Sequence, residues 1–452
     1  MESKELRLWQ ACSDGDLEIV KDLADDAAVD VNRGDAELGR TPFYRACFFG
    51  KITVVEYLMR NPRVDVGKAQ KEGATPFYVA CQNGRKEVVS LLLADPRIDP
   101  NTADQEGFTP FHLVCWYDHE EVIPLLLADP RIDPDRANKN GTTPIFMACQ
   151  TGDKEVVSLL LGDPRIDPRK QNDYGTTPFF SACQSQNKEV VSLLLRDSRI
   201  DPNKPTNDGE TPFFIACCFG HEEVVSLLLA DSRIDPNKSA NDGASPFFMA
   251  SQNGHKEVVS LLLADPRIDA NKPKDGQTTP LWIASQNGHL AVVQRLLASD
   301  REIDTRTIST FNYKTAAEHG RTMGGLTTKE EADTAEDHQR KKTNGPICAD
   351  LIDEYERDPG AVRHRLRRQP GLREYFIGPL FALGIFHSDS YVVIKEEVAQ
   401  ADTKRFFRIM SRLPLDLQMV LCNRAFGSSK DIILSRDSEP GFKCLARTTT
   451  WQ

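Results

Sequence analysis

The sequence predicts an all-α fold, a solenoid of helix-turn-helix units with hairpin loops that is followed by a small helical domain. Two observations lead to this prediction. A Thr-Pro or Ser-Pro pair returns every 34 residues, and an apolar segment of helical period follows each pair at a fixed distance. A repeat of this length indicates stacked supersecondary units rather than one globular core. The pairs begin at Thr41, Thr75, Thr109, Thr143, Thr177, Thr211, Ser245 and Thr279.

The first helix of each unit can be derived from the unit that begins at Thr75. A Thr hydroxyl at the N-cap accepts a backbone N–H, and Pro76 at the first helical position already has the helical φ. The predicted helix therefore runs from Thr75 to Asn83. Gly84 ends it, because glycine adopts the left-handed conformation readily.

The second helix is predicted from Lys86 to Ala94. Its apolar residues share one face, which consists of Val88, Val89, Leu92 and Leu93. Two short helices cannot bury such a face alone, so neighbouring units must cover it.

A turn-rich segment follows the second helix and contains an Asp-Pro-Arg-Ile-Asp motif in several units, as at Asp95 to Asp99. We expect the Asp and Arg side chains of this array to pair across units, each exposed pair contributing less than ~1 kcal/mol. The alternative is that this charged stripe binds a charged partner.

The units resemble the ankyrin-repeat family. They share G-x-T-P, an apolar residue, Ala-Cys or Ala-Ser, a Gly and then V-V-x-L-L-L, in eight consecutive copies. The usual family His is kept only at His112 and is Phe or Tyr in most copies. The loop after the second helix is one residue longer than the commonest family form. The resemblance covers about residues 5–324 and implies nine or ten repeats.

Two further copies lie at the ends of the array. An earlier copy starts at Leu6 and lacks the Thr-Pro pair, so we predict an N-terminal cap and number it copy one. A degenerate copy ten lies at about residues 305–324. Its first helix is expected from Lys314 to Gly324, and its second helix is missing.

Cysteine recurs at one point of the first helix, which predicts a small side chain at a helix contact rather than a ligand or a disulfide. Ser251 and Ser285 take the same place in later copies. Reduced thiols fit an intracellular protein. The seven recurring cysteines are Cys12, Cys47, Cys81, Cys115, Cys149, Cys183 and Cys217.

No catalytic pattern stands out. We expect the histidines that recur at the start of the second helix, such as His119 and His255, to be surface or capping groups. The sequence has no Gly-rich phosphate loop, no H-E-x-x-H motif and no nucleophile elbow. We therefore predict a non-enzymatic protein with no cofactor and no metal site. The enzyme alternative would place its chemistry in residues 346–452, at His364 or His387.

Composition and charge restrict the classes of partner that the protein could bind. A net charge of −11 over 452 residues disfavours nucleic acid, which basic surfaces bind. The longest apolar run, Tyr375 to Phe386, is too short to span a bilayer. The chain begins with charged residues and without a signal peptide. We expect a monomer in the cytoplasm, or alternatively the nucleus, that binds partner proteins and no membrane.

Candidate binding residues are those where single copies depart from the consensus. Most copies carry Gln-Asn or a near equivalent just before the helix-ending Gly. Copy two has Phe48-Phe49, copy four has Trp116-Tyr117 and copy seven has Cys218-Phe219. The resemblance places this position beside the concave groove where partners bind, so we predict partner contacts at these aromatics.

Copy four departs furthest from the consensus of the repeats. Phe108 precedes its Thr109, Asp118 replaces the Gly, and Pro124 lies inside its second helix, which would kink or shorten that helix. Clustered exposed aromatics are typical protein-binding anchors, and Phe108 is a further candidate. The alternative is that Trp116 and Tyr117 fill a hole left by the shifted helix.

Two more candidates are Arg45 and Tyr174. Arg45 stands where other copies have an apolar or small residue, next to Phe48-Phe49, and Tyr174 lies at a hairpin tip. The alternative for Phe48-Phe49 is packing on Trp9.

After the repeats the sequence predicts a charged linker or solvated helix at 325–345, a boundary at Gly345-Pro346 and a helical domain at 346–452. Helices are expected around Ile347 to Tyr355, after Asp358-Pro359 and at 404–426. The basic run at Arg363 to Arg368 is interpreted as one helix face, with an acidic partner or the solenoid itself as the alternative. We hypothesise that this domain docks onto the end of the stack.

The residues thus predict an interaction scaffold or adaptor that binds through the concave groove and the hairpin tips. The alternative is a substrate-recruiting subunit of a ubiquitin-ligase-type complex. It depends on Leu413-Pro414-Leu415-Asp416-Leu417, which faintly resembles the start of an F-box-type helix.

Overall fold

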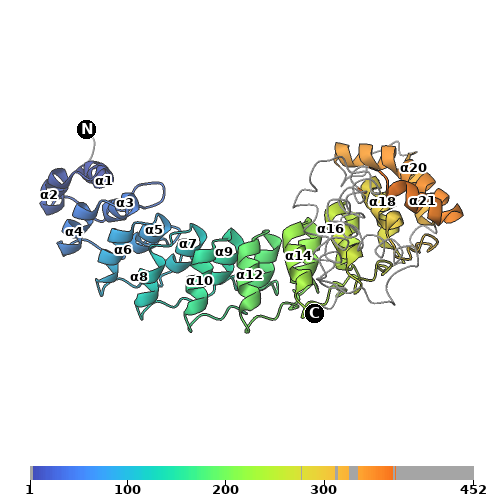
Figure 1. Ribbon diagram of the computed structural model, residues 1–452. Helices are drawn as coiled ribbons and strands as arrows, with labels where there is room; N and C mark the ends of the chain where they lie inside the picture. Colours follow the sequence, from blue (N-terminus) through green and yellow to red (C-terminus); the bar gives the residue numbers. More distant parts are fainter. Residues whose placement is uncertain (1–3, 276, 311–313, 325–333, 370–371, 373–452) are drawn as a thin grey trace, which may run out of the picture. The chain divides into compact units, whose positions relative to one another are not determined.

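The computed structural model describes residues 4–275, 277–310, 314–324, 334–369 and 372 (Figure 1). The regular elements of these residues are α-helices, apart from one isolated bridge between Lys274 and Thr278. The chain divides into two compact units, residues 1–215 and 216–452. No described helix is both long and apolar enough to cross a membrane.

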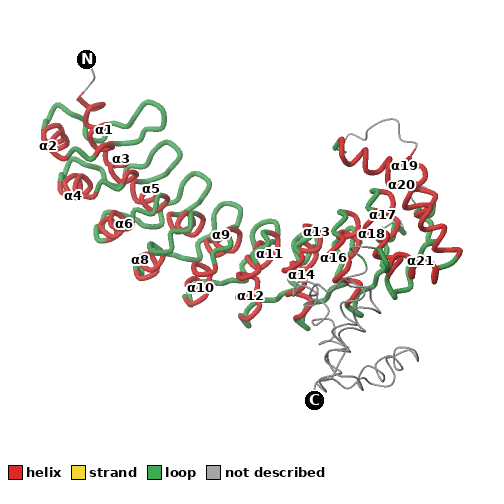
Figure 2. Tube along the Cα trace, turned by 45° about the horizontal axis from the view of Figure 1, so that its top comes forward, coloured by secondary structure: helices red, strands yellow, loops and turns green. Residues whose placement is uncertain are grey.

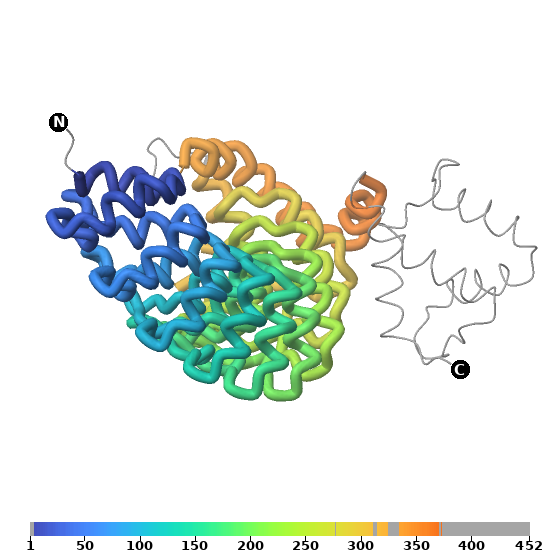
Figure 3. The backbone as a smooth tube through the Cα atoms, turned by 90° about the vertical axis from the view of Figure 1, so that its left-hand side faces the viewer, coloured from blue at the N-terminus to red at the C-terminus, as the bar shows by residue number. Residues whose placement is uncertain are grey.

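The first unit consists of two rows of short helices, because each copy contributes one helix to each row. Helices of one row pack on their neighbours in the same row, and the loops between copies project from one side (Figures 2 and 3). The first row is α1 (Lys4–Asp14), α3 (Pro42–Phe49), α5 (Pro76–Gln82), α7 (Pro110–Trp116), α9 (Pro144–Thr151) and α11 (Pro178–Gln184). The second row is α2 (Leu17–Asp25), α4 (Ile52–Arg60), α6 (Lys86–Leu93), α8 (Ile123–Ala128), α10 (Lys154–Gly162) and α12 (Lys188–Arg196).

The predicted unit is confirmed in copy three. The Thr75 hydroxyl accepts the N–H of Tyr78 at 3.1 Å, and α5 begins at Pro76. Gly84 has φ +61°, the left-handed conformation expected after the helix. In α6 the side chains of Val88, Val89 and Leu92 are buried. Amphipathic helices with capped ends therefore follow directly from the repeated residues.

The recurring cysteines are buried, as the small-residue interpretation predicts. Each thiol lies in the contact between first-row helices, and burial raises its pKa well above the ordinary range, as at Cys81 and Cys183. These thiols therefore pack as small apolar groups.

The Asp-Arg array pairs differently from the prediction. Arg165 forms its ion pair with Asp163 of its own copy, at 2.6 Å, rather than with a neighbouring copy. Its remaining N–H groups cross to copy four and donate to the carbonyls of Leu127 at 2.7 Å and Ile132 at 3.2 Å. The Leu127 carbonyl is at the end of α8, where carbonyls lack partners in their own helix, and the Ile132 carbonyl lies in the following loop. In the first unit, arginines thus tie copies two to six each to the preceding copy, and much of the charged stripe there is engaged within the protein.

The residue after the left-handed residue that ends the first helix has a similar role in the first row. His119 Nε2 donates to the carbonyl of Gln82, at 2.9 Å, and Asn187 Nδ2 donates to that of Cys149, at 3.1 Å. The side chain at this position lies against the Gly of the preceding copy, as His119 does against Gly84. The sequence predicts a surface or capping group at the start of the second helix, whereas His119 binds the end of α5 in the preceding copy and does not cap α8.

The second unit continues the same arrangement. α13 (Pro212–Phe219) spans the division between the units. The first-row helices that follow are α15 (Pro246–Gln252), α17 (Pro280–Gln286) and α19 (Ala316–Gly324). The second-row helices of this unit are α14 (Glu222–Ala230), α16 (Lys256–Ala264) and α18 (Leu290–Ala298). Two more helices follow, α20 (Ala335–Arg357) and α21 (Pro359–Leu366).

α20 corrects two expectations. Copy ten is not left without a following helix, since α20 packs along α19. α20 also continues through Gly345-Pro346, where the sequence predicts a boundary. A Cβ atom on Gly345 would lie 2.7 Å from the carbonyl oxygen of Gly320, so this glycine permits close packing of α19 and α20 instead of ending a helix. The predicted helix around Ile347 to Tyr355 is the C-terminal part of α20.

α20 and α21 cover copy nine with contacts that resemble those of a further repeat (Figure 1). Arg340 Nε donates to the carbonyl of Asn287 at 3.0 Å, at the end of α17. Arg367 Nε donates to the carbonyl of Ala298 at 2.7 Å, at the end of α18, and its guanidinium pairs with Asp300 at 2.6 Å. The predicted basic run therefore binds the end of the stack in part, as terminal capping elements do.

Asp358 caps α21, as predicted, by accepting the N–H of Ala361 at 2.9 Å. The expectations for residues 373–452, including the apolar run, the helices at 404–426, His387 and the Leu413–Leu417 motif, lie outside the described residues.

Candidate protein-binding surface

Five aromatic side chains are exposed among the described residues, and the sequence predicted all five as binding candidates. Three of them, Phe49, Tyr117 and Phe219, occupy the same register position, just before the left-handed residue that ends the first helix. The exposed fractions are Phe49 37%, Trp116 37%, Tyr117 48%, Tyr174 68% and Phe219 49%.

In copy four the aromatic pair follows from the way α7 ends. Trp116 is the last residue of the helix and Tyr117 is its C-cap. Asp118 then adopts φ +61° in the place where other copies have glycine. The Tyr117 ring stacks on His119, with 6.3 Å between centroids. Since His119 is bonded to copy three, the Tyr117 ring lies on an anchored support.

Pro124 shortens the second helix of copy four, as predicted. α8 begins at Ile123, so proline occupies its first turn, where its missing N–H is tolerated. A hollow of about 470 Å³ lies between α6 and α8. It is lined by Ser90, Leu93, Leu125, Ala128, Asp129, Pro130 and Arg131. Neither Trp116 nor Tyr117 lines this hollow, and both side chains are exposed.

Phe108 lies apart from this pair. It is half-buried at the N-terminal end of α7 and packs edge-on against His112, with 5.7 Å between centroids. His112 is buried, and its side chain completes a capping box with Thr109. Burial lowers the pKa of His112 to about 4, so the imidazole is neutral at pH 7. Phe108 thus supports a structural histidine.

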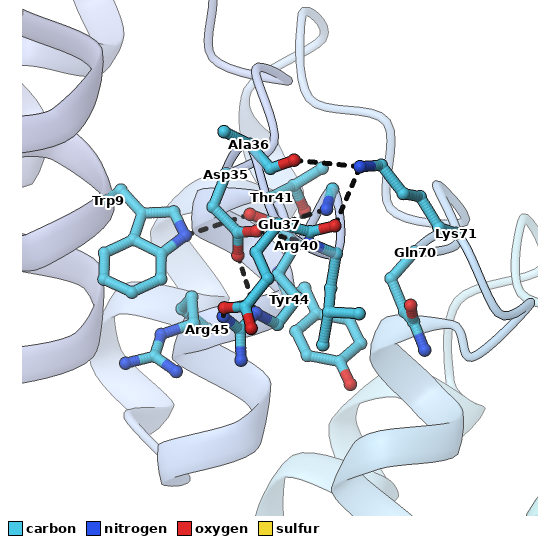
Figure 4. Close-up of polar contacts among 12 residues, drawn as sticks. Trp9, Asp35, Ala36, Glu37, Arg40, Thr41, Tyr44, Arg45, Gln70 and Lys71 are labelled. Carbon is cyan, nitrogen blue, oxygen red and sulfur yellow. Dashed lines mark hydrogen bonds and ion pairs between the residues drawn. The ribbon is translucent and has the colours of Figure 1, made fainter.

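Copy two uses its aromatics differently from copy four. Figure 4 shows Trp9 of copy one and Arg45 of copy two close to each other. The Arg45 guanidinium lies 4.0 Å from the centroid of the Trp9 ring and 4.6 Å from that of Phe49. Its Nε donates to the Ser13 hydroxyl at 3.0 Å. Phe48 packs edge-on against Phe49 at 4.9 Å. Arg45 therefore connects the aromatics of copy two to copy one, in agreement with the packing alternative.

The two remaining candidates are more isolated. Phe219 stacks on His221 at 5.8 Å between centroids, the arrangement also formed by Tyr117 and His119. Tyr174 lies in a hairpin loop, where its carbonyl accepts the N–H of Asn207 at 3.0 Å and its side chain is the most exposed of the five.

The sequence missed a pair of acidic groups beside Tyr117. The Asp118 carboxyl hydrogen-bonds the Asp153 carboxyl of copy five, and this contact, together with desolvation and nearby Glu120 and Glu155, raises the pKa of Asp118 to about 6. Asp153 also caps α10 by accepting the N–H of Val156 at 2.6 Å. The contact could have been predicted, because the residue after each helix-ending position lies on that position of the preceding copy.

Among the described residues, no group of three or more His, Cys, Asp or Glu side chains could hold a metal ion. The surface is therefore characterised by exposed aromatic rings and carboxylates.

Comparison with protein families gives one assignment. A family model described as "Ankyrin repeats (3 copies)" matches residues 8–104, 96–172, 162–240 and 232–307. These segments include all the candidate residues. A comparison with curated proteins finds no match.

Proposed function

Because the chain belongs to the ankyrin-repeat family, whose repeats are generally protein–protein interaction modules, we propose that it is a non-enzymatic scaffold or adaptor. Its partner protein binds along the ends of the first-row helices, in the predicted concave groove, and at the hairpin tips. Proteins of this family are typically interaction scaffolds without catalytic activity.

One observation supports this proposal above the others. Exposed aromatics interrupt a polar consensus at a single register position, and copy four places two of them, Trp116 and Tyr117, next to each other. Tyr and Trp bury a large apolar area with little loss of side-chain entropy, and they are enriched among the residues that dominate binding energy. The neighbouring copies have Gln82-Asn83 and Gln150-Thr151 there, which makes copy four the specific part of the surface.

The proposed function is tested by proximity labelling in cells with the full chain and two variants. Trp116→Ala/Tyr117→Ala removes the aromatic pair, and Gln150→Ala/Thr151→Ala truncates the same positions in copy five. We expect the first variant to lose at least tenfold of the labelling of the partner, and the second to keep it. Both should stay folded, with a melting temperature within about 4 °C of the wild type, because a loss of about 1 kcal/mol or less shifts the melting of a large protein by only a few degrees. A partner retained by the aromatic variant would refute the proposal.

The ubiquitin-ligase alternative depends on Leu413–Leu417, which lies outside the described residues, so it stays a prediction. A pull-down that requires residues 404–426 would favour it.

A further inference from the structure

We propose that the copy-four surface binds an arginine or lysine side chain of the partner, which lies on the Trp116 and Tyr117 rings and pairs with the carboxylates of Asp118 and Asp153. This inference rests on the proposed function and names the chemistry of the partner segment.

A similar contact between a guanidinium and aromatic rings already exists within the protein. In copy two, Arg45 lies between the rings of Trp9 and Phe49, and the Ser13 hydroxyl accepts its N–H. An aromatic pair at this register position is thus already combined with a guanidinium once in the structure. Cations are attracted to aromatic faces within about 6 Å of the centroid.

Copy four has aromatic rings at the register of Phe48 and Phe49 without the internal cation, while the counterpart of Trp9, Tyr78, is buried. Leu113 takes the place of Arg45 in the repeat, and its side chain is buried in the core. The Trp116 and Tyr117 rings are therefore left without an internal guanidinium among the described residues. A cation from the partner would lie on the rings of copy four, as Arg45 lies on the rings of Trp9 and Phe49 in copy two.

The charges next to Tyr117 fit such a cation. Asp118, Glu120 and Glu155 are exposed, and Asp153 is half-buried. No described ion pair involves any of these four carboxylates, whereas the acidic residues of the Asp-Pro-Arg motif are paired within their own copies. Carboxylates accept paired hydrogen bonds from a guanidinium, and these bonds are about twice as strong as neutral ones.

The acidic pair is particular to this junction. The position of Asp118 is Gly50, Gly84 and Gly152 in neighbouring copies, and the position of Asp153 is Lys51, Arg85 and His119. Two carboxyls that meet across copies repel each other unless they share a proton, which is the reason for the raised pKa of Asp118. A cation between them would relieve this repulsion on binding.

The copy-four surface is preorganised for binding. Asp153 is fixed by its cap on α10, and Tyr117 stacks on a histidine that is bonded to copy three. Less conformational entropy is then lost on association, so a single cationic side chain can be bound specifically.

The test is a selection of twelve-residue random peptides on the immobilised full chain, followed by affinity measurements with two double variants. Asp118→Asn/Asp153→Asn removes two charges from the surface, and asparagine tolerates both the left-handed conformation and the N-cap. The control variant, Glu189→Gln/Glu257→Gln, removes two charges from exposed positions of copies six and eight that share the register of Glu155.

We expect the selected peptides to be enriched in arginine or lysine next to an apolar residue. Their affinity should fall at least tenfold with Asp118→Asn/Asp153→Asn and less than twofold with Glu189→Gln/Glu257→Gln. Selection of no peptide, peptides without basic enrichment, or equal losses with the two variants would overturn the inference.

The same variants separate this inference from the proposed function. If the cellular partner is lost with Trp116→Ala/Tyr117→Ala and retained with Asp118→Asn/Asp153→Asn, the scaffold function stands and the cationic contact is wrong. If both variants retain the partner, both proposals fail.

Discussion

Copies two and four carry aromatics at the same register position, and their surroundings differ. In copy two, Phe48 and Phe49 lie beside Arg45, which stacks on Trp9 of copy one. In copy four, Trp116 and Tyr117 lie beside carboxylates that have no described ion pair. The difference teaches that an exposed aromatic in a repeat is not by itself a binding residue. The groups around the ring decide whether it stabilises the stack or remains available to a partner.

The largest predicted difference is in stability. Phe48→Ala/Phe49→Ala should lower the free energy of unfolding by about 2 kcal/mol, because the substitution removes half-buried ring contacts and the face on which Arg45 lies. Trp116→Ala/Tyr117→Ala should lower it by about 1 kcal/mol, because no internal guanidinium lies on these two rings. Chemical denaturation of the full chain measures both values. Equal losses would mean that the copy-four rings also serve packing.

Arg45 gives the next largest effect. Arg45→Leu introduces the residue type that copy four has at this position, and it should cost about 1 kcal/mol through the lost cation–π contacts and the lost bond to Ser13. Arg45→Lys should recover part of that loss. A melting temperature unchanged by Arg45→Leu would contradict the assignment of copy two to packing.

Asp118 should show a smaller effect of opposite sign. Asp118→Gly should stabilise the protein by about 0.5 kcal/mol, because it relieves the left-handed strain and the repulsion from Asp153. Gln186 is the matched control, since it has φ +63° at the same position in copy six and no facing carboxylate. Gln186→Gly should stabilise the protein less than Asp118→Gly does, and it should leave peptide binding unchanged. Asp118→Gly should raise the melting temperature and weaken peptide binding.

The smallest effect is a pH dependence of that stabilisation. The pKa of Asp118 rises from 3.8 to about 6 on folding, so the native state holds its proton more tightly than the unfolded chain. The Asp118 contribution to stability is therefore present at low pH and is lost as pH rises through this window.

The gain from Asp118→Gly should accordingly grow between about pH 4 and pH 6 and level off above it. The charged groups beside Asp118 are Asp153, Glu120 and Glu155, and His119 stacks on its neighbour Tyr117. All four are present in both proteins, so melting curves of the pair isolate Asp118. A gain that does not change with pH would show that strain alone is relieved.

The sequence predicts much of this fold because the repeat sets the local structure. Thr75 as a cap, Gly84 as a helix end and Cys81 as a buried contact each follow from a residue type at a fixed position. The five exposed aromatics were also predictable, since each departs from its own consensus.

The rest depends on how copies meet. Arg165 pairs within its copy because the carbonyls of copy four take its other N–H groups, and the motif alone does not reveal this choice. The sequence predicts a boundary at Gly345, because a Gly-Pro pair is typical of turns. The close contact of Gly345 with Gly320, which explains the glycine inside α20, is not visible in the sequence. The Asp118–Asp153 contact was missed because it joins residues that are adjacent only in the stack.

The most direct test of the central claim, that copy four carries the binding surface, is photo-crosslinking in cells from a benzoylphenylalanine introduced at one position of the full chain. We compare Tyr117 with Phe49 and Thr151, which share its register in copies two and five. The account predicts a discrete adduct from position 117 that is abolished by Asp118→Asn/Asp153→Asn, and little or none from positions 49 and 151. Adducts from position 49 alone, or equally from all three positions, would contradict it.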